Sequence, residues 1–422
     1  MNILNIKYKN IYDTIIFYMF IHLIGNMLIP LNRWVGSILC FYAILQIIIN
    51  IKKKGSLRFP FHGSVEALFI IYLLLDIFCV IIQSYFRGSA PWGNEFLSLL
   101  SYHFVSDSFY MAFLLPFFIL IDYRKFSLSM FLKLVPYISC LGILFFAINY
   151  KNILLSAYRI QSHTFLNGEE FAKYFSSVSF SLLLWPVLKN KKKIIPVIIF
   201  GILALLTTII MARRGSSLSI GIIFIFTIYQ IIKKISFLKR ILLFILLLGI
   251  GISLYNYYKI NSKGIFINIT EKGMNDSRGE VNRYFEKDVF NSLDLWFGRG
   301  LNGEYYCPQR YVDPEGGYMY VTYRQSIETG FYHLILKGGI IFAIIHVLIL
   351  LGAVIKGMFH SNNIVIKAFS LWILLSLIEL YPFGWPTFSI KFLLIWIGVC
   401  LCYSRRYRKM NDQKICNILK IQ

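Results

Sequence analysis

Charged residues are scarce in this chain, and their scarcity excludes an ordinary soluble domain. Only 15% of the 422 residues are charged, whereas 57% are hydrophobic and 17% are aromatic. A soluble core cannot bury so much apolar surface, and the apolar runs reach the roughly 20 residues with which a helix crosses a bilayer. We therefore expect an all-α, polytopic integral membrane protein.

The sequence also lacks the usual motifs of metal and nucleotide chemistry. It contains no His-Glu-x-x-His zinc motif, no acids in calcium-loop spacing and no Gly-x-x-x-x-Gly-Lys nucleotide loop. Of the 7 cysteines, Cys307 alone lies in the long polar segment 257–329, so no disulfide can form within that segment. We expect neither a metal nor a soluble cofactor.

We also expect no cleavable signal peptide. The first apolar segment follows Lys7 and Lys9, is about twenty residues long and has no small-x-small cleavage site. We expect this segment to remain in the protein as a signal anchor.

The net charge of +23 comes from basic clusters at alternate loops, a pattern typical of cytoplasmic loops and not of a nucleic-acid-binding surface. Twelve spans with both termini in the cytoplasm satisfy every cluster except Arg213-Arg214. We expect no nucleic-acid partner. The predicted spans cover residues 12–30, 34–51, 64–86, 109–121, 130–150, 170–188, 194–211, 217–232, 241–255, 328–355, 364–381 and 389–403.

These spans divide the chain into four parts. Residues 1–256 hold spans one to nine, 257–329 form one large external loop, 330–403 hold spans ten to twelve, and 404–422 form a basic cytoplasmic tail. The aromatic residues of the loop give it enough apolar area to fold, and the pattern predicts short helices there, including an amphipathic one over 278–290.

Arg213-Arg214 lies at an external turn, where the charge rule disfavours paired arginines. One interpretation is that both side chains snorkel to lipid headgroups. The other is that one of them faces a water-filled cavity and binds an anion. Adjacent residues on a helix point about 100° apart, so only one would face such a site.

Three short motifs occur in order in the second half of the chain. They are Arg214-Gly215-Ser216, then Arg278 followed by Gly298-Arg299-Gly300, then Glu328 to His333 followed by Gly338-Gly339-Ile340-Ile341. Together with the many spans and the single late loop, these motifs resemble those of the O-antigen polymerase and O-antigen ligase superfamily of bacterial surface-polysaccharide enzymes.

The resemblance implies a GT-C-like glycosyltransferase of the bacterial inner membrane, with its loop in the periplasm. Such an enzyme polymerises undecaprenyl-diphosphate-linked repeat units into O-antigen, capsule or exopolysaccharide. Its partners would be that lipid-linked glycan, membrane lipids, a chain-length regulator and other polysaccharide assembly proteins. Ligases, which transfer glycan to the lipid A core in lipopolysaccharide, have a histidine where this chain has Glu328, and this difference favours a polymerase.

The implied chemistry gives roles to particular residues. Arginine binds diphosphate oxygens bidentately and stays charged, so Arg214 and Arg278 are the first candidates for stabilising the leaving diphosphate. Glu328 would act as general base or orient the acceptor hydroxyl, and it would share a helical face with Arg324. Further candidates for substrate binding are Arg213, Arg283, Arg299, Arg324 and His333.

Structural interpretations of the same residues stay open. Each arginine of the loop could simply pair with a nearby carboxylate, Glu328 could cap the N-terminus of span ten, and His333 could bond within the helix bundle. Two other classes of protein also stay open. A lipid-linked glycan flippase suits twelve spans, although the sequence shows no repeat, and a scaffold would need none of these residues.

Overall fold

The computed structural model describes residues 10–29, 31–54, 58–83, 110–155, 162–211, 213–233, 278–312, 318–381 and 386–421, and short pieces between 249 and 260. Only the backbone is described at 110, 154–155, 162–170, 214, 278, 309–312 and 318–321. The chain forms two compact units, which we describe separately. Unit 1 comprises Met1–Leu134 and Arg278–Gln422, and unit 2 comprises Val135–Ser277.

The described chain is mainly helical, and seven of its helices are long and apolar enough to cross a membrane. This confirms a helical membrane protein, whereas the count of twelve spans stays a prediction. Predicted span 241–255 falls largely outside the described residues. The seven are α1 (Ile11–Leu28), α2 (Arg33–Lys54), α3 (Ser64–Leu75) with its continuation η2 (Asp76–Ile82), α6 (Ser129–Leu155), α8 (Ile195–Ile210) with η7 (Lys191–Ile194), α9 (Arg214–Ile232) and α14 (Gly330–Phe359).

Unit 1 packs α1, α2, α3 and α14 with two shorter helices, α15 (Ile364–Glu379) and α16 (Ile390–Tyr403), and with η3 (Tyr110–Leu120). Apart from Lys391 near its start, α16 is apolar on all sides, as in a helix enclosed by others, and most of its residues are buried. Aromatic rings fill the space between α3, α14 and α16. Tyr72 stacks on Phe342 with 4.9 Å between ring centroids, and Trp396 lies 5.4 Å from Tyr72.

Unit 2 contains α7 (Ser162–Leu183), α8, α9 and most of α6. Its core is also aromatic: the Phe200 ring lies 5.1 Å from Phe171 and 5.4 Å from Phe175. Gly142 on α6 makes room for Phe200, because a Cβ at this glycine would come within 2.5 Å of the ring. Close packing therefore joins α6, α7 and α8.

The segment before α14 is folded, and we call residues 278–312 and 318–329 the cap. It contains α12 (Arg278–Val289), α13 (Asp294–Phe297) and an antiparallel hairpin of β1 (Tyr305–Val312) and β2 (Tyr318–Arg324). Helix α12 confirms the amphipathic helix expected over 278–290, with Val281, Phe285 and Val289 buried. The hairpin was not expected, since the sequence predicted only short helices there.

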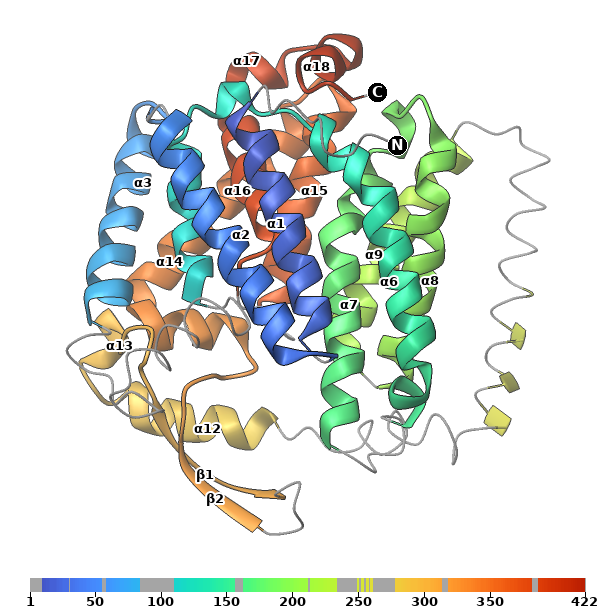
Figure 1. Cartoon of the computed structure of the whole chain (residues 1–422). Helices are drawn as coiled ribbons and strands as arrows, with labels where there is room; N and C mark the ends of the chain where they lie inside the picture. Colours follow the sequence, from blue (N-terminus) through green and yellow to red (C-terminus); the bar gives the residue numbers. More distant parts are fainter. Residues whose placement is uncertain are drawn as a thin grey trace. The chain divides into compact units, whose positions relative to one another are not determined.

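The C-terminal segment is folded too. It forms α17 (Arg405–Arg408) and α18 (Asp412–Ile418), and the Asn363 side chain donates to the carbonyls of Tyr407 and Met410 at 2.9 and 3.1 Å. Figure 1 shows that α17 and α18 lie at one end of the unit 1 helices and that the cap lies at the other end. The predicted tail is therefore a packed element, and it lies opposite the cap.

Candidate functional site

Helix α14 breaks at Gly339, and the cap contacts the membrane-spanning helices of unit 1 at this break. Gly339 has φ +82° and ψ 171°, a backbone conformation that is essentially restricted to glycine. The carbonyls just before such a break need hydrogen-bond donors from outside the helix. The N–H of Arg299 donates to the Leu336 carbonyl at 2.7 Å, and the N–H of Gly300 donates to the Lys337 carbonyl at 3.0 Å.

Two glycines let the cap backbone approach this break. Gly298 also has a positive φ, +72°, and a Cβ there would come within 2.6 Å of the backbone of Lys337 and Gly339. A Cβ at Gly339 would lie 2.0 Å from the Trp296 carbonyl oxygen. The structure thus brings together the Gly298-Arg299-Gly300 and Gly338-Gly339 parts of two motifs from the sequence analysis.

Lys337 adds a side-chain contact between α14 and the cap. We call the contacts of residues 298–303 with α14 and η2 the cap joint. Its side chain is fully buried, and Nζ donates to the carbonyls of Leu301 and Gly303 at 2.7 and 3.0 Å. A lysine inside an apolar run is costly unless it has partners, so the sequence did carry a signal for this residue. Lys337 was nevertheless not among the site residues predicted from the sequence.

The other side of the cap turn, residues 298–301, is held by η2 and by Gln83, which directly follows it. The Leu301 N–H donates to the Val80 carbonyl at 3.1 Å, and Gln83 Nε2 donates to the Gly298 carbonyl at 2.9 Å. The turn 298–301 is therefore clamped between η2 and α14. A displacement of η2 or of α14 would therefore act directly on the backbone of this turn.

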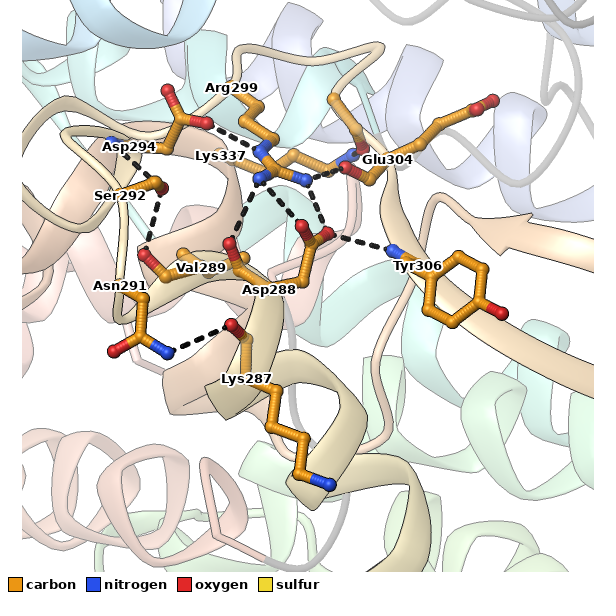
Figure 2. Close-up of polar contacts among 11 residues, drawn as sticks. Lys287, Asp288, Val289, Asn291, Ser292, Asp294, Arg299, Glu304, Tyr306 and Lys337 are labelled. Atoms are coloured by element: carbon orange, nitrogen blue, oxygen red, sulfur yellow. Dashed lines mark hydrogen bonds and ion pairs between the residues drawn. The ribbon is translucent and has the colours of Figure 1, made fainter.

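Arg299 organises the interior of the cap (Figure 2). Its guanidinium pairs with Asp288 at 2.7 Å and with Asp294 at 2.8 Å, and it donates to the Glu304 carbonyl at 2.6 Å. All three charged side chains are largely shielded, with 16 to 27% of their surface exposed. These contacts favour a role for Arg299 in holding the cap together, and binding of substrate by Arg299 stays a prediction.

Asp288 is the acceptor at the centre of this network. Its Oδ2 also accepts the Tyr306 N–H at 2.8 Å, which ties α12 to β1. Burial acts to raise the pKa of Asp288, but the hydrogen bonds from Arg299 and Tyr306 outweigh it, so the pKa is lowered from its ordinary value. Asp288 is therefore ionised throughout the neutral and mildly acidic range.

Asp288→Asn is expected to destabilise the cap by about 1–3 kcal/mol, because Arg299 loses its closest ionic partner. The pH dependence should change as well. A lowered folded pKa stabilises the cap above the unfolded aspartate value of about 3.9, and that contribution is lost as the pH falls through the folded pKa.

Hydrogen exchange of residues 299–312 from pH 6 to pH 2.5, corrected for intrinsic exchange, measures this. Protection should fall with acid in the wild type and be low and flatter in Asp288→Asn. Glu280→Gln, an exposed change on the same helix, should follow the wild type. Equal protection in Asp288→Asn and wild type would contradict the assigned role.

An aromatic cluster seats the cap on the first turn of α14. Phe285 stacks on Tyr332 with 5.0 Å between centroids and meets the Tyr305 ring edge-on at 5.4 Å. Tyr332 Oη donates to Glu286 Oε1 at 2.6 Å, and Thr329 Oγ1 donates to Asn282 Oδ1 at 3.1 Å. Both apolar and polar contacts therefore fix α12 on α14.

The other predicted site residues of unit 1 lie on α12, just before α14 or within α14. Arg278 begins α12, although its side chain is outside the described set, and Arg283 is exposed on the same helix. Glu328 is half-buried just before α14, and His333 is fully buried within α14. Arg213 and Arg214 belong to unit 2, so the convergence of Arg214 with Arg278 stays a prediction.

The predicted helical face shared by Arg324 and Glu328 is wrong. Arg324 ends strand β2, opposite Tyr305, and α14 begins only at Gly330 with Thr329 as its N-cap. The backbone is in the extended conformation of a strand up to Arg324, so Arg324 and Glu328 do not lie on one helix.

Comparison of the chain with protein-family models, with curated proteins and with solved structures gave no match. In the part of the chain that the structure describes, no group of three or more His, Cys, Asp or Glu side chains is placed to hold a metal ion.

Proposed function

We propose that the protein is a glycosyltransferase of the bacterial inner membrane that polymerises undecaprenyl-diphosphate-linked repeat units into a surface polysaccharide. The cap would face the periplasm, and the reaction would take place between the cap and the membrane. The proposal combines the motif resemblance with the chemistry of the arginines, the exposed face of the cap and the position of the cap relative to the basic C-terminal segment.

The observation that carries the proposal is the start of α9. Arg213 is its N-cap residue and Arg214 its first helical residue, and the first turn of α9 contains no acidic residue. The N-terminal end of a helix carries partial positive charge, so a bound anion there would be stabilised both by the helix end and by the arginine charge. A diphosphate is an anion of the right charge, and the planar arginine fork matches its oxygens.

The exposed face of the cap supports a glycan as the second substrate. Tyr306 and Tyr323 face each other across the hairpin with 5.8 Å between ring centroids, and Tyr284 lies 6.4 Å from Tyr306. Tyr306 is 43% exposed and Tyr323 is 55% exposed. Tyrosine offers both an apolar ring and a hydroxyl, which suits the mixed apolar and polar faces of a sugar.

The arrangement of charges supports a periplasmic cap. The exposed basic residues Arg405, Arg406 and Lys409 lie on the C-terminal segment, at the end of unit 1 opposite the cap (Figure 1). Basic clusters mark the cytoplasmic side of inner-membrane proteins. The cap would then lie where flipped lipid-linked glycans are displayed.

In the proposed reaction, a hydroxyl of the acceptor glycan attacks the anomeric carbon of the donor glycan. The new glycosidic C–O bond forms as the bond from that carbon to the diphosphate breaks, and undecaprenyl diphosphate leaves with the electron pair. Arg214 and Arg278 would stabilise the negative charge that grows on the diphosphate. Glu328 would take the hydroxyl proton or orient the acceptor.

Tyr306→Ala and Tyr323→Ala are expected to shorten the polymer, because each removes an aromatic contact with the acceptor. The loss of about 1 kcal/mol per ring corresponds to roughly fivefold weaker acceptor binding. Tyr306→Phe and Tyr323→Phe keep the rings and are the matched controls. Gel profiles of the surface glycan should shift to shorter chains in the alanine variants, and the shift should be smaller in the phenylalanine variants, which lose only the hydroxyl. Unchanged lengths in the alanine variants at wild-type protein level would exclude this surface as an acceptor site.

Deletion of the gene, followed by complementation, tests the proposed function. A polymerase predicts that the deletion leaves single repeat units in place of long chains and that the wild-type gene restores the chains. Long chains that remain on the polyprenyl carrier would indicate a ligase. Repeat units trapped on the cytoplasmic side would indicate a flippase, and an unchanged glycan would exclude all three activities.

A further inference from the structure

Asp76 is an acid buried in the membrane-spanning part of unit 1. It is the first residue of η2, which continues α3, and its side chain is fully buried. Among the residues that the structure describes, neither carboxylate oxygen has a hydrogen-bond partner.

A group of aromatic residues lies on α3 and α14 one turn before Asp76. Tyr72 lies one turn earlier on α3, and the Asp76 N–H donates to its carbonyl. Tyr72 Oη is paired with His346 Nδ1 on α14 at 3.0 Å, and its ring stacks on Phe342. The titratable groups beside Asp76 on α3 and α14 are therefore already paired with each other. The buried cation of α14, Lys337, donates to the carbonyls of Leu301 and Gly303.

An ionised carboxylate in such a place has a large energetic cost. Burying a charge without a partner costs many kcal/mol, whereas burying a neutral carboxylic acid costs far less. Neither oxygen of Asp76 accepts a hydrogen bond from the residues that the structure describes, so no partner there offsets a negative charge. The neutral acid is therefore the form of Asp76 that this part of the fold accommodates.

The backbone at Asp76 is also unusual. Residues Asp76–Ile82 form a π-helical segment, a rare geometry that is frequent at functional sites. Four residues further on, the Val80 carbonyl holds the Leu301 N–H of the cap turn. The buried acid and the cap joint therefore lie on one short, irregular segment.

We propose that Asp76 is a proton-binding site, a carboxylic acid held neutral where α3 continues into η2. Loss of its proton would demand water or a cation in the helical core, and η2 would have to move to admit it. Because η2 also holds Leu301, ionisation of Asp76 would loosen the cap joint. The proposal is independent of the glycosyltransferase reaction.

Reaction with dicyclohexylcarbodiimide tests the proposal on the purified full-length protein in liposomes. This apolar reagent takes up the proton and the carboxyl group of a neutral acid together, giving an acylurea with no leaving group. Peptide mapping by mass spectrometry should find at least about tenfold more adduct on Asp76 than on the ion-paired Asp288, since only the neutral acid is cheaply buried. Asp76→Asn should remove the adduct.

Three results would overturn the proposal. The first is a folded protein without adduct on Asp76, and the second is equal labelling of Asp76 by a water-soluble carbodiimide, which would indicate an exposed acid. The third is protection of Asp76 by added sodium ions, which would indicate a metal-cation site.

The Asp76→Asn variant supplies a second test, because asparagine matches the neutral acid in size and charge. The variant should keep the cap docked, so the buried Cys307 should react with maleimide no faster than in the wild type. Exposure of Cys307 in Asp76→Asn would show that the fold needs the carboxylate and would contradict a neutral Asp76.

Discussion

Replacing Gly339 by alanine is expected to release the cap from α14 and to reduce activity to the level of the deletion strain. The backbone at Gly339 would cost about 1–3 kcal/mol for any residue with a Cβ. The added Cβ would also lie 2.0 Å from the Trp296 carbonyl oxygen, and a backbone atom cannot turn aside as a side chain can. Cap and helix would have to separate, with loss of the Arg299 and Gly300 hydrogen bonds.

Gly279→Ala is the matched control for this change. Gly279 lies on α12 with open space around it, and alanine there favours the helix by about 0.5–1 kcal/mol. Cys307, which is buried in the cap, reports docking through its reaction with maleimide. The accessible Cys140 and Cys416 should first be changed to serine. Fast labelling in Gly339→Ala alone is predicted, and slow labelling in both variants would show that the glycine joint does not hold the cap.

Arg278→Ala and Arg214→Ala are each expected to lower polymer formation by about 10²–10³-fold, since each would remove a cation from the leaving diphosphate. Lysine should restore only part of the activity, because it lacks the bidentate fork. The double variant tests whether both arginines bind the same group. If they do, its loss should be smaller than the product of the two single losses.

Lys287→Ala controls for the loss of positive charge, since Lys287 is an exposed base on the same helix as Arg278. Its polymer should match the wild type. Protein level in the membrane would be measured for every variant. Normal chain lengths in both arginine variants would show that these two residues do not carry the reaction, even if the protein is a polymerase.

The helices were the most predictable part of this fold. Long apolar runs and the spacing of Val281, Phe285 and Val289 depend on local sequence alone, and the structure confirms a helical membrane protein and α12. The hairpin had a local signal that was not used. Tyrosine-rich runs flank Asp-Pro-Glu-Gly-Gly at residues 313–317, which is typical of two strands and a turn.

The joint between the cap and α14 could not be predicted in this way. The glycines at 298 and 339 stood out as motif residues, but their contact depends on a break in α14 and on donors that lie far away in the sequence. The same holds for Arg299. Its charge fitted a phosphate-binding residue in the sequence, and only the fold shows how closely Asp288 and Asp294 approach it.

Reconstitution with lipid-linked substrate tests the central claim most directly. Single repeat units on undecaprenyl diphosphate, extracted from the deletion strain, would be added to the purified full-length protein in liposomes, and the products separated by length. We predict a ladder of lipid-linked polymers, with one undecaprenyl diphosphate released for each linkage formed, and no ladder from Arg278→Ala. Repeat units that stay single with the folded wild-type protein would contradict a polymerase.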